Sequence, residues 1–126
     1  MRKKLIGITL GLLLSGLGST VVVAENTSYY IDSKQGSDRA EGRSEKGAWK
    51  TLANVNTLTF EPGDNVLFKS GGNWVGQLQL KGAGTEGNPI RVGRYGKGKA
   101  PLIAGAGKED SAVLLQNGSH WVVEDL

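Results

Sequence analysis

Acidic side chains are the residues of this chain that could perform acid–base chemistry on a sugar, because such chemistry needs two carboxyl groups at a defined separation. They fall mainly in predicted loops, and no spacing singles out a pair. We therefore interpret them as solvated loop acids and predict no catalytic residue among them. The acids considered are Asp32, Asp38, Glu41, Glu45, Glu109, Asp110, Glu124 and Asp125.

A calcium site is the one metal site that these acids suggest. Asp32, Asp38 and Glu41 surround Gly36 in one polar loop, and calcium takes several oxygen ligands from flexible loops. The loop lacks the D-x-[DN]-x-[DN]-G pattern of an EF-hand, and a chain without cysteine has no thiolate ligands. We predict no metal and no cofactor, with calcium at these three acids as the alternative.

Basic and aromatic side chains could supply contacts to a saccharide. His120, the single histidine, could be a base or a sugar contact, but a histidine without a visible partner is more often structural. Trp74 and Trp121 could stack on sugar rings, although burial in the core or beneath a cap is the stronger interpretation. Three further cations could neutralise acidic sugars or simply face solvent: Lys81, Arg91 and Arg94. The sequence leaves the substrate-binding residues unassigned.

Residues 1–24 have the pattern of a secretory signal peptide. Arg2, Lys3 and Lys4 precede an apolar stretch over residues 5–17, and Val22-Val23-Ala24 is a small-residue cleavage site. The uncharged run is also about the 20 residues that a membrane anchor needs, but its four glycines and the well-placed Ala24 favour cleavage. We predict a secreted chain, extracellular or at the cell surface, with no membrane partner after cleavage.

The charge of the remaining chain gives no support to a nucleic-acid partner. Three of the fifteen Lys and Arg residues lie in the predicted signal, so twelve remain against twelve acids. The mature chain is therefore near neutral, and it is short enough for one small domain. Without disulfides an exported domain must be held by its core alone, which favours a repetitive β architecture.

Short β-prone segments separated by glycine-rich turns fill the second half of the chain, with centres about 10 to 13 residues apart. Before them, residues 49–56 predict a short helix with Trp49, Leu52, Ala53 and Val55 on one side and Ser44 as a nearby N-cap. Pro62-Gly63-Asp64 predicts a type II turn. The predicted strands are residues 29–31, 66–68, 74–75, 77–80, 90–92, 102–104, 112–115 and 121–126.

This spacing fits a sandwich, a barrel or a β-solenoid, and two features favour the solenoid. The segments are short, and several are continuous apolar runs rather than strict alternations. The predicted helix precedes the strands, where it could cover the open end of a stack. We predict an all-β parallel β-helix and divide the chain into residues 1–24, 25–64 and 65–126.

Four motifs occur in a fixed order after the predicted signal. They are Tyr29-Tyr30-Ile31-Asp32, Ala48-Trp49-Lys50-Thr51-Leu52, Pro62-Gly63-Asp64-Asn65-Val66-Leu67-Phe68 and Gly87-Asn88-Pro89-Ile90. With them the mature chain resembles the N-terminal entrance of bacterial secreted right-handed parallel β-helix proteins, the pectate-lyase-like superfamily. The resemblance implies a cap helix followed by the first two to three coils, with catalytic groups on more central coils.

The resemblance further implies an N-terminal fragment of a secreted carbohydrate-active protein, a polysaccharide lyase or a glycoside hydrolase, inactive by itself. A polysaccharide would be the partner of the full-length protein. Because the last predicted strand ends at Leu126 without a turn or a cap, we expect truncation and self-association of the fragment. Two alternatives stay open: a non-catalytic adhesive β-solenoid that binds glycans or host surfaces, and a complete short exported structural protein.

Overall fold

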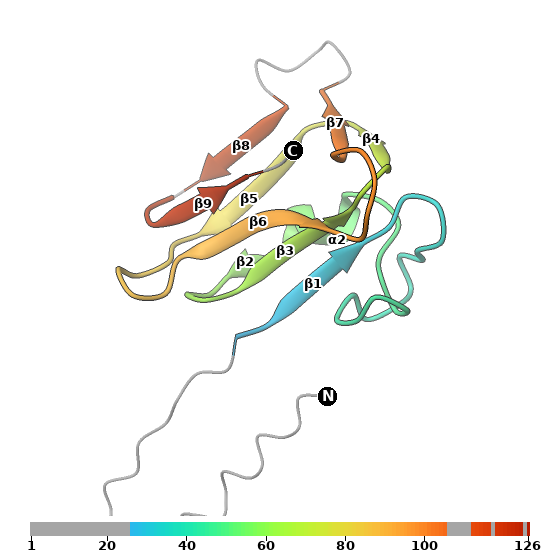
Figure 1. Ribbon diagram of the computed structural model, residues 1–126. Helices are drawn as coiled ribbons and strands as arrows, with labels where there is room; N and C mark the ends of the chain where they lie inside the picture. The colour runs from blue at the N-terminus through green and yellow to red at the C-terminus, as the bar shows by residue number, and fades with distance from the viewer. Residues whose placement is uncertain (1–25, 106–111, 117, 125) are drawn as a thin grey trace, which may run out of the picture.

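The computed structural model describes residues 26–105, 112–116, 118–124 and 126, which form an all-β unit with one short helix (Figure 1). The predicted signal segment and three of the candidate acids, Glu109, Asp110 and Asp125, lie outside the described residues. In the part of the chain that is described, no helix is long and apolar enough to span a membrane.

The strands form three sheets, and every strand pair is parallel. Sheet A contains β1 (Ser28–Ile31), β3 (Asn65–Lys69), β6 (Ile90–Tyr95) and β9 (Trp121–Val123), in that order. Sheet B contains β2 (Thr59–Phe60), β5 (Leu78–Gly82) and β8 (Val113–Gln116). Sheet C contains β4 (Asn73–Val75) and β7 (Leu102–Ala104).

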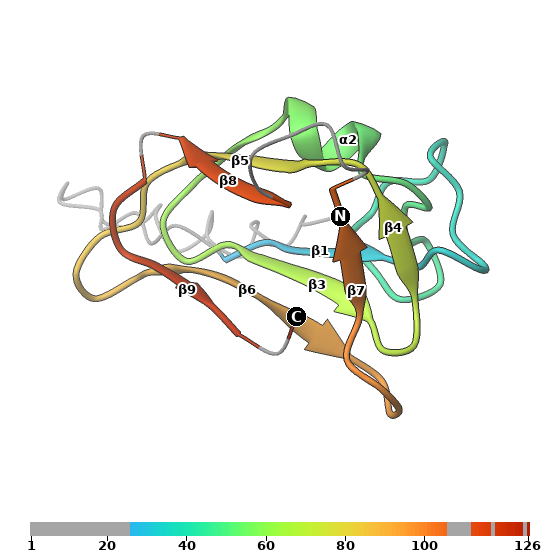
Figure 2. The ribbon, with the colours of Figure 1, turned by 90° about the horizontal axis from the view of Figure 1, so that it is seen from above.

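Successive strands visit the three sheets in a repeating order. From β3 the chain passes to β4 in sheet C, to β5 in sheet B and back to sheet A at β6, and it then repeats this path through β7, β8 and β9 (Figure 2). Equivalent residues of successive rounds stack, so Val66 lies opposite Val92 and Val92 lies opposite Val123. Neighbouring strands come from successive rounds rather than from hairpins, which is why they run parallel.

Apolar side chains of the three sheets meet in one interior. Burial alternates along β3, where Val66 and Phe68 are buried and Leu67 is not, and it alternates along β5 in the same way. These two strands therefore present one inner and one outer face, so the continuous apolar run Val66-Leu67-Phe68 does not make β3 buried on both faces. The buried cluster comprises Ile31, Trp49, Leu52, Val55, Phe60, Val66, Phe68, Trp74, Leu78, Leu80, Ile90 and Val92.

The helix is shorter than the sequence predicts. It is α2 (Ala53–Thr57) rather than residues 49–56, because Trp49 instead forms a parallel bridge with Ile31 beside β1. Leu52 occupies the N-cap position, so the prediction of Ser44 is wrong. Trp49, Leu52 and Val55 reach the core as predicted, whereas Ala53 is exposed.

Each predicted strand overlaps an observed one, and only the two-residue β2 was missed. Its one buried side chain, Phe60, pairs in register with Gly82 and gives no periodic signal. The turn at Pro62-Gly63-Asp64 has the predicted type II geometry. The Asp64 N–H donates to the Glu61 carbonyl at 3.0 Å, and Gly63 has a φ of 86° at the third position.

Candidate functional site

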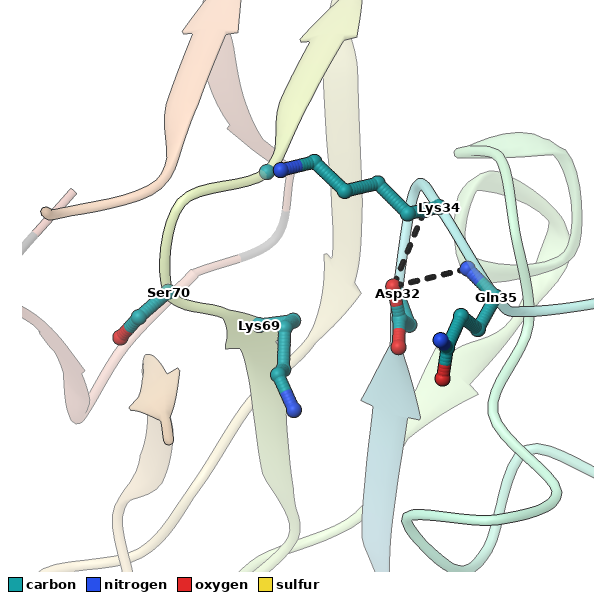
Figure 3. A pocket seen from close by; sticks show the side chains of 6 residues that line it. Asp32, Lys34, Gln35, Lys69 and Ser70 are labelled. Carbon is teal, nitrogen blue, oxygen red and sulfur yellow. Dashed lines mark hydrogen bonds between the residues drawn. The ribbon is translucent and has the colours of Figure 1, made fainter. Parts of the chain in front are cut away.

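A polar cleft of about 180 Å³ opens beside the carboxyl ends of β1 and β3 (Figure 3). One side comes from the loop after β1 and the other from the end of β3 and the turn that follows it. Because Ile31 pairs with Phe68 in parallel register, the residues that follow them, Asp32 and Lys69, are neighbours at this edge. The lining residues are Asp32, Lys34, Gln35, Lys69, Ser70 and Gly72.

Asp32 fixes the loop that forms one wall. Its Oδ1 accepts the backbone N–H groups of Lys34 at 2.9 Å and of Gln35 at 3.1 Å. Its own N–H donates to the carbonyl of Trp49 at 2.7 Å. Only 8% of Asp32 is exposed, and its carboxylate holds Lys34 and Gln35 at the rim of the cleft through an Asx turn.

The turn after β3 forms the opposite wall. The Ser70 hydroxyl donates to the carbonyl of Gly96 at 2.9 Å, and the Ser70 N–H donates to the carbonyl of Tyr95 at 2.8 Å. A Cβ at Gly72 would lie 2.5 Å from the Trp74 ring and 2.9 Å from the Ser33 hydroxyl, so no side chain fits there without displacing a neighbour. This wall is therefore held by backbone contacts and tight packing.

An aromatic pair adjoins the cleft on the outer face of sheet A. Lys69 Nζ lies 5.3 Å from the centroid of the Tyr95 ring, and that ring meets Tyr30 edge-to-face at 5.1 Å. Burial raises the pKa of Tyr95 to about 12, and the charges of Asp32 and Glu45 and the nearby Tyr30 act in the same direction. The Tyr95 hydroxyl is buried and has no hydrogen-bond partner within the described residues.

The alternative of a calcium site at the early acids is not supported. Asp38 Oδ1 accepts the N–H groups of Lys50 and Thr51 at 2.9 Å each, and its Oδ2 accepts the Thr51 hydroxyl at 2.6 Å. Among the described residues no group of three or more His, Cys, Asp or Glu could hold a metal ion. Asp32 and Asp38 instead use their carboxylates to fix the polar loop.

The charge on Asp38 is stabilised in this loop. Burial acts to raise its pKa, but the hydrogen bonds from Thr51 and Lys50 and the Lys50 charge outweigh burial. The pKa of Asp38 therefore lies below its ordinary value of 3.8.

The predicted basic contacts do not line the cleft. Lys81 donates from Nζ to the carbonyl of Asn56 in α2, and Arg94 donates to the carbonyl of Gly98 at 2.9 Å. Arg91 and His120 are exposed, and His120 has a φ of 58°, a left-handed conformation that non-glycine residues rarely adopt. Lys81 and Arg94 thus have structural hydrogen bonds.

Both candidate tryptophans pack against the core. Trp74 is 5% exposed, and its indole N–H donates to the Lys50 carbonyl at 2.9 Å. Trp121 is half-buried, and its indole N–H donates to the Gly82 carbonyl at 2.9 Å. The structure therefore places Trp74 in the core, as the preferred interpretation predicts, and leaves part of Trp121 accessible.

No protein-family model matches the sequence. A lacto-N-biosidase from Bifidobacterium longum subsp. longum is 36% identical over 103 residues, covering 76% of this chain and 6% of that protein. The GH136 lacto-N-biosidase from Eubacterium ramulus gives TM-scores of 0.69 and 0.68 for its selenomethionine and native crystal structures, at 34% identity. The match covers 79% of this chain and 20% and 19% of those chains. The chain thus resembles a small part of a glycoside hydrolase.

The cleft residues were largely missed by sequence reasoning. Lys34, Gln35, Lys69 and Ser70 follow or end two β segments that lie far apart in the chain. Polar residues directly after a strand were the available signal, but nothing local shows that β1 and β3 are neighbours. Only the register of sheet A brings the two groups together.

Proposed function

We propose that this chain forms the N-terminal part of a secreted or cell-surface glycoside hydrolase built on a right-handed parallel β-helix. The observation that carries the proposal is the match to the Eubacterium ramulus lacto-N-biosidase, with 34% identity and a TM-score of 0.69. The repeating path through three parallel sheets supports the β-helix. Membership of the pectate-lyase-like superfamily and export by a cleaved signal are parts of the same proposal.

Hydrolysis is the better choice between the two carbohydrate chemistries that the sequence left open. The relatives are lacto-N-biosidases, and one is described as GH136. An oligosaccharide or polysaccharide would accordingly be the substrate of the whole protein.

The chain by itself is expected to be inactive. The carboxylates of Asp32, Asp38 and Asp64 all accept backbone N–H groups, which is a structural use of these acids. This chain matches about a fifth of the Eubacterium ramulus structure. The catalytic pair of the whole protein would therefore lie outside this chain.

A chimaera tests this proposal. The matched part of the Eubacterium ramulus enzyme would be replaced by residues 26–126 of this chain, and folding and lacto-N-biosidase activity would be measured. We expect a folded, active chimaera, no activity when the part is deleted, and no turnover by this chain alone. A chimaera that fails to fold beside a folding parent, or turnover by the isolated chain, would contradict the proposal.

Self-association is proposed for the isolated chain. Within the described residues β7, β8 and β9 each have a strand neighbour on one side only. The apolar side chains that close the core at this end, Ile103, Val113 and Trp121, are only partly buried, in contrast to the fully buried residues one round earlier. Open strand edges and apolar surface promote association. Light scattering after size exclusion should show oligomers that increase with concentration, whereas a monomer throughout would exclude this.

A non-catalytic glycan-binding solenoid is the second candidate. The polar cleft at the carboxyl ends of β1 and β3 favours it, because the cleft contains hydrogen-bonding groups and a single carboxylate rather than a catalytic pair. An inactive chimaera that still binds glycan would support this candidate over the hydrolase.

A further inference from the structure

The carboxylate of Asp32 is only half used by the fold. Its Oδ1 accepts two backbone N–H groups, while its Oδ2 has no hydrogen-bond partner within the described residues. The residue is 8% exposed and lines the cleft. This oxygen is not among the buried atoms that lack a partner, so it is accessible from the cleft, where a water or a ligand can hydrogen-bond to it. The free oxygen therefore marks the cleft as a place for a hydrogen-bond donor.

Two ammonium groups supply donors to the same cleft. Lys34 extends from the loop after β1 toward the turn that follows β3, and Lys69 comes from the end of β3 on the opposite wall (Figure 3). Neither has an ion pair within the described residues, and Lys69 is positioned by the Tyr95 ring. Lys34 is exposed and can reorient, so both ammonium groups can donate to oxygens of a ligand in the cleft that Asp32 lines.

Ser70 and Gly72 complete the lining of the cleft and limit its size. The Ser70 hydroxyl already donates to Gly96, so its oxygen can only accept a further hydrogen bond. Gly72 cannot gain a side chain without meeting Trp74. The volume of about 180 Å³ lies below the roughly 300 Å³ at the lower end of ordinary ligand pockets, so the cleft suits one small ring.

The cleft places a hydrogen-bond acceptor, Asp32, beside two donors, Lys34 and Lys69. This arrangement favours a ligand whose groups can both donate and accept hydrogen bonds. A carboxylate or phosphate that pairs with a lysine would also lie beside the charge of Asp32, and a cation would face two lysines. A hydroxyl can donate to Asp32 and accept from Lys34 or Lys69. We propose that the cleft is a non-catalytic subsite for a single neutral sugar ring of a glycan, an inference that rests on the proposed carbohydrate-active function.

Amide shifts in the isotope-labelled 126-residue chain test the subsite. Galactose and N-acetylglucosamine serve as neutral probes, and glucuronate serves as the charged probe. We expect the neutral sugars to move the amide signals of Lys34, Gln35, Ser70 and Gly72 in a saturable manner, with glucuronate at least tenfold weaker. No saturable shift with either neutral sugar, or tighter binding of glucuronate, would overturn the proposal.

Substitutions at the cleft complete the test. Asp32→Asn keeps the Oδ1 acceptor for the loop but removes the charge, and Lys69→Met keeps the aliphatic stem beside Tyr95. Each should weaken sugar binding at least fivefold with unchanged spectra elsewhere, and Lys34→Met, at an exposed side chain that cannot disturb the core, should do the same. Lys97→Met, on the exposed turn after β6, is the matched control and should bind as the parent does. Equal binding by all four variants would refute the site.

The chimaera and the sugar titration can refute the two proposals independently of each other. An active chimaera with no sugar binding at the cleft would refute the subsite alone. Cleft binding by a chain whose chimaera does not fold would refute the hydrolase proposal and leave the subsite in place.

Discussion

Replacing Trp74 by phenylalanine separates a core tryptophan from one that stacks on sugars. The side chain is 5% exposed, its N–H donates to the Lys50 carbonyl, and its ring meets Phe68 edge-to-face with centroids 5.0 Å apart. Phenylalanine keeps an aromatic ring but loses the indole N–H and part of the buried volume. We expect Trp74→Phe to lower the free energy of unfolding and to leave saccharide binding unchanged.

The size of the loss follows from these contacts. A neutral hydrogen bond contributes about 1 kcal/mol, and the unpaired Lys50 carbonyl and the small cavity add about 1–2 kcal/mol. The total of about 2–3 kcal/mol is a large part of the roughly 5–15 kcal/mol that stabilises an ordinary domain. For a domain of this size, each lost kcal/mol lowers Tm by about 4–8 °C.

Urea unfolding followed by circular dichroism measures this loss, and Trp121→Phe is the matched control. Trp121 also donates its indole N–H to a carbonyl, that of Gly82, but it is only half-buried, so its replacement should cost about 1 kcal/mol. A Trp74→Phe variant with unchanged stability and weakened saccharide binding would refute the assignment of this residue to the core.

Three further predictions concern the backbone and the two perturbed pKa values. Gly82→Ala, whose Cβ would lie 2.4 Å from the Phe60 carbonyl at a φ of 124°, should lose about 2–4 kcal/mol in thermal unfolding. Gly71→Ala, with open space around its Cβ, should lose only about 1–2 kcal/mol of backbone strain; equal losses would contradict the clash. Because the folded-state pKa of Asp38 is lowered, its stabilisation is present above pH 3.8 and is lost as the pH falls through the folded value. The free energy of unfolding of Asp38→Asn should therefore depend less on pH in acid than that of the parent. An unchanged pH dependence below pH 3.8 would be contrary evidence. Because the folded-state pKa of Tyr95 is raised from 10.0 to about 12, stability should fall over that pH range. Tyr95→Phe should abolish the late tyrosinate absorbance step; its persistence would assign the shift to another tyrosine.

Local sequence was sufficient for every described strand except β2 and for the type II turn. Val66 and Phe68 belong to a short apolar segment bounded by glycine and proline, and Gly63 accepts the positive φ that the turn requires. These signals act over a few residues, so they can be read without knowing any neighbour. The helix was overestimated because Trp49, at helical spacing from Leu52, instead pairs with Ile31 across the loop.

The cleft depends on two segments that lie far apart in the chain. Its place among acids suggests Asp32 as a calcium ligand, yet its carboxylate accepts the amides of Lys34 and Gln35 and lines one cleft with Lys69 from another strand. The contribution of Lys69 depends on which strand lies beside β1, and composition carries no such information. Strand β2 is too short to show an alternation of buried and exposed residues in the sequence. Its Phe60 is buried because it pairs with β5 in the next round, which is again a contact between distant residues.

By itself the sequence determined an all-β chain of short strands, because hydrophobic spacing and glycine-rich turns constrain the backbone locally. Only the tertiary structure decided that successive rounds stack in parallel register and that Asp32 and Lys69 share one cleft. The physical reason is that strand pairing joins residues far apart in the chain, where burial and backbone hydrogen bonds of the whole stack select one register.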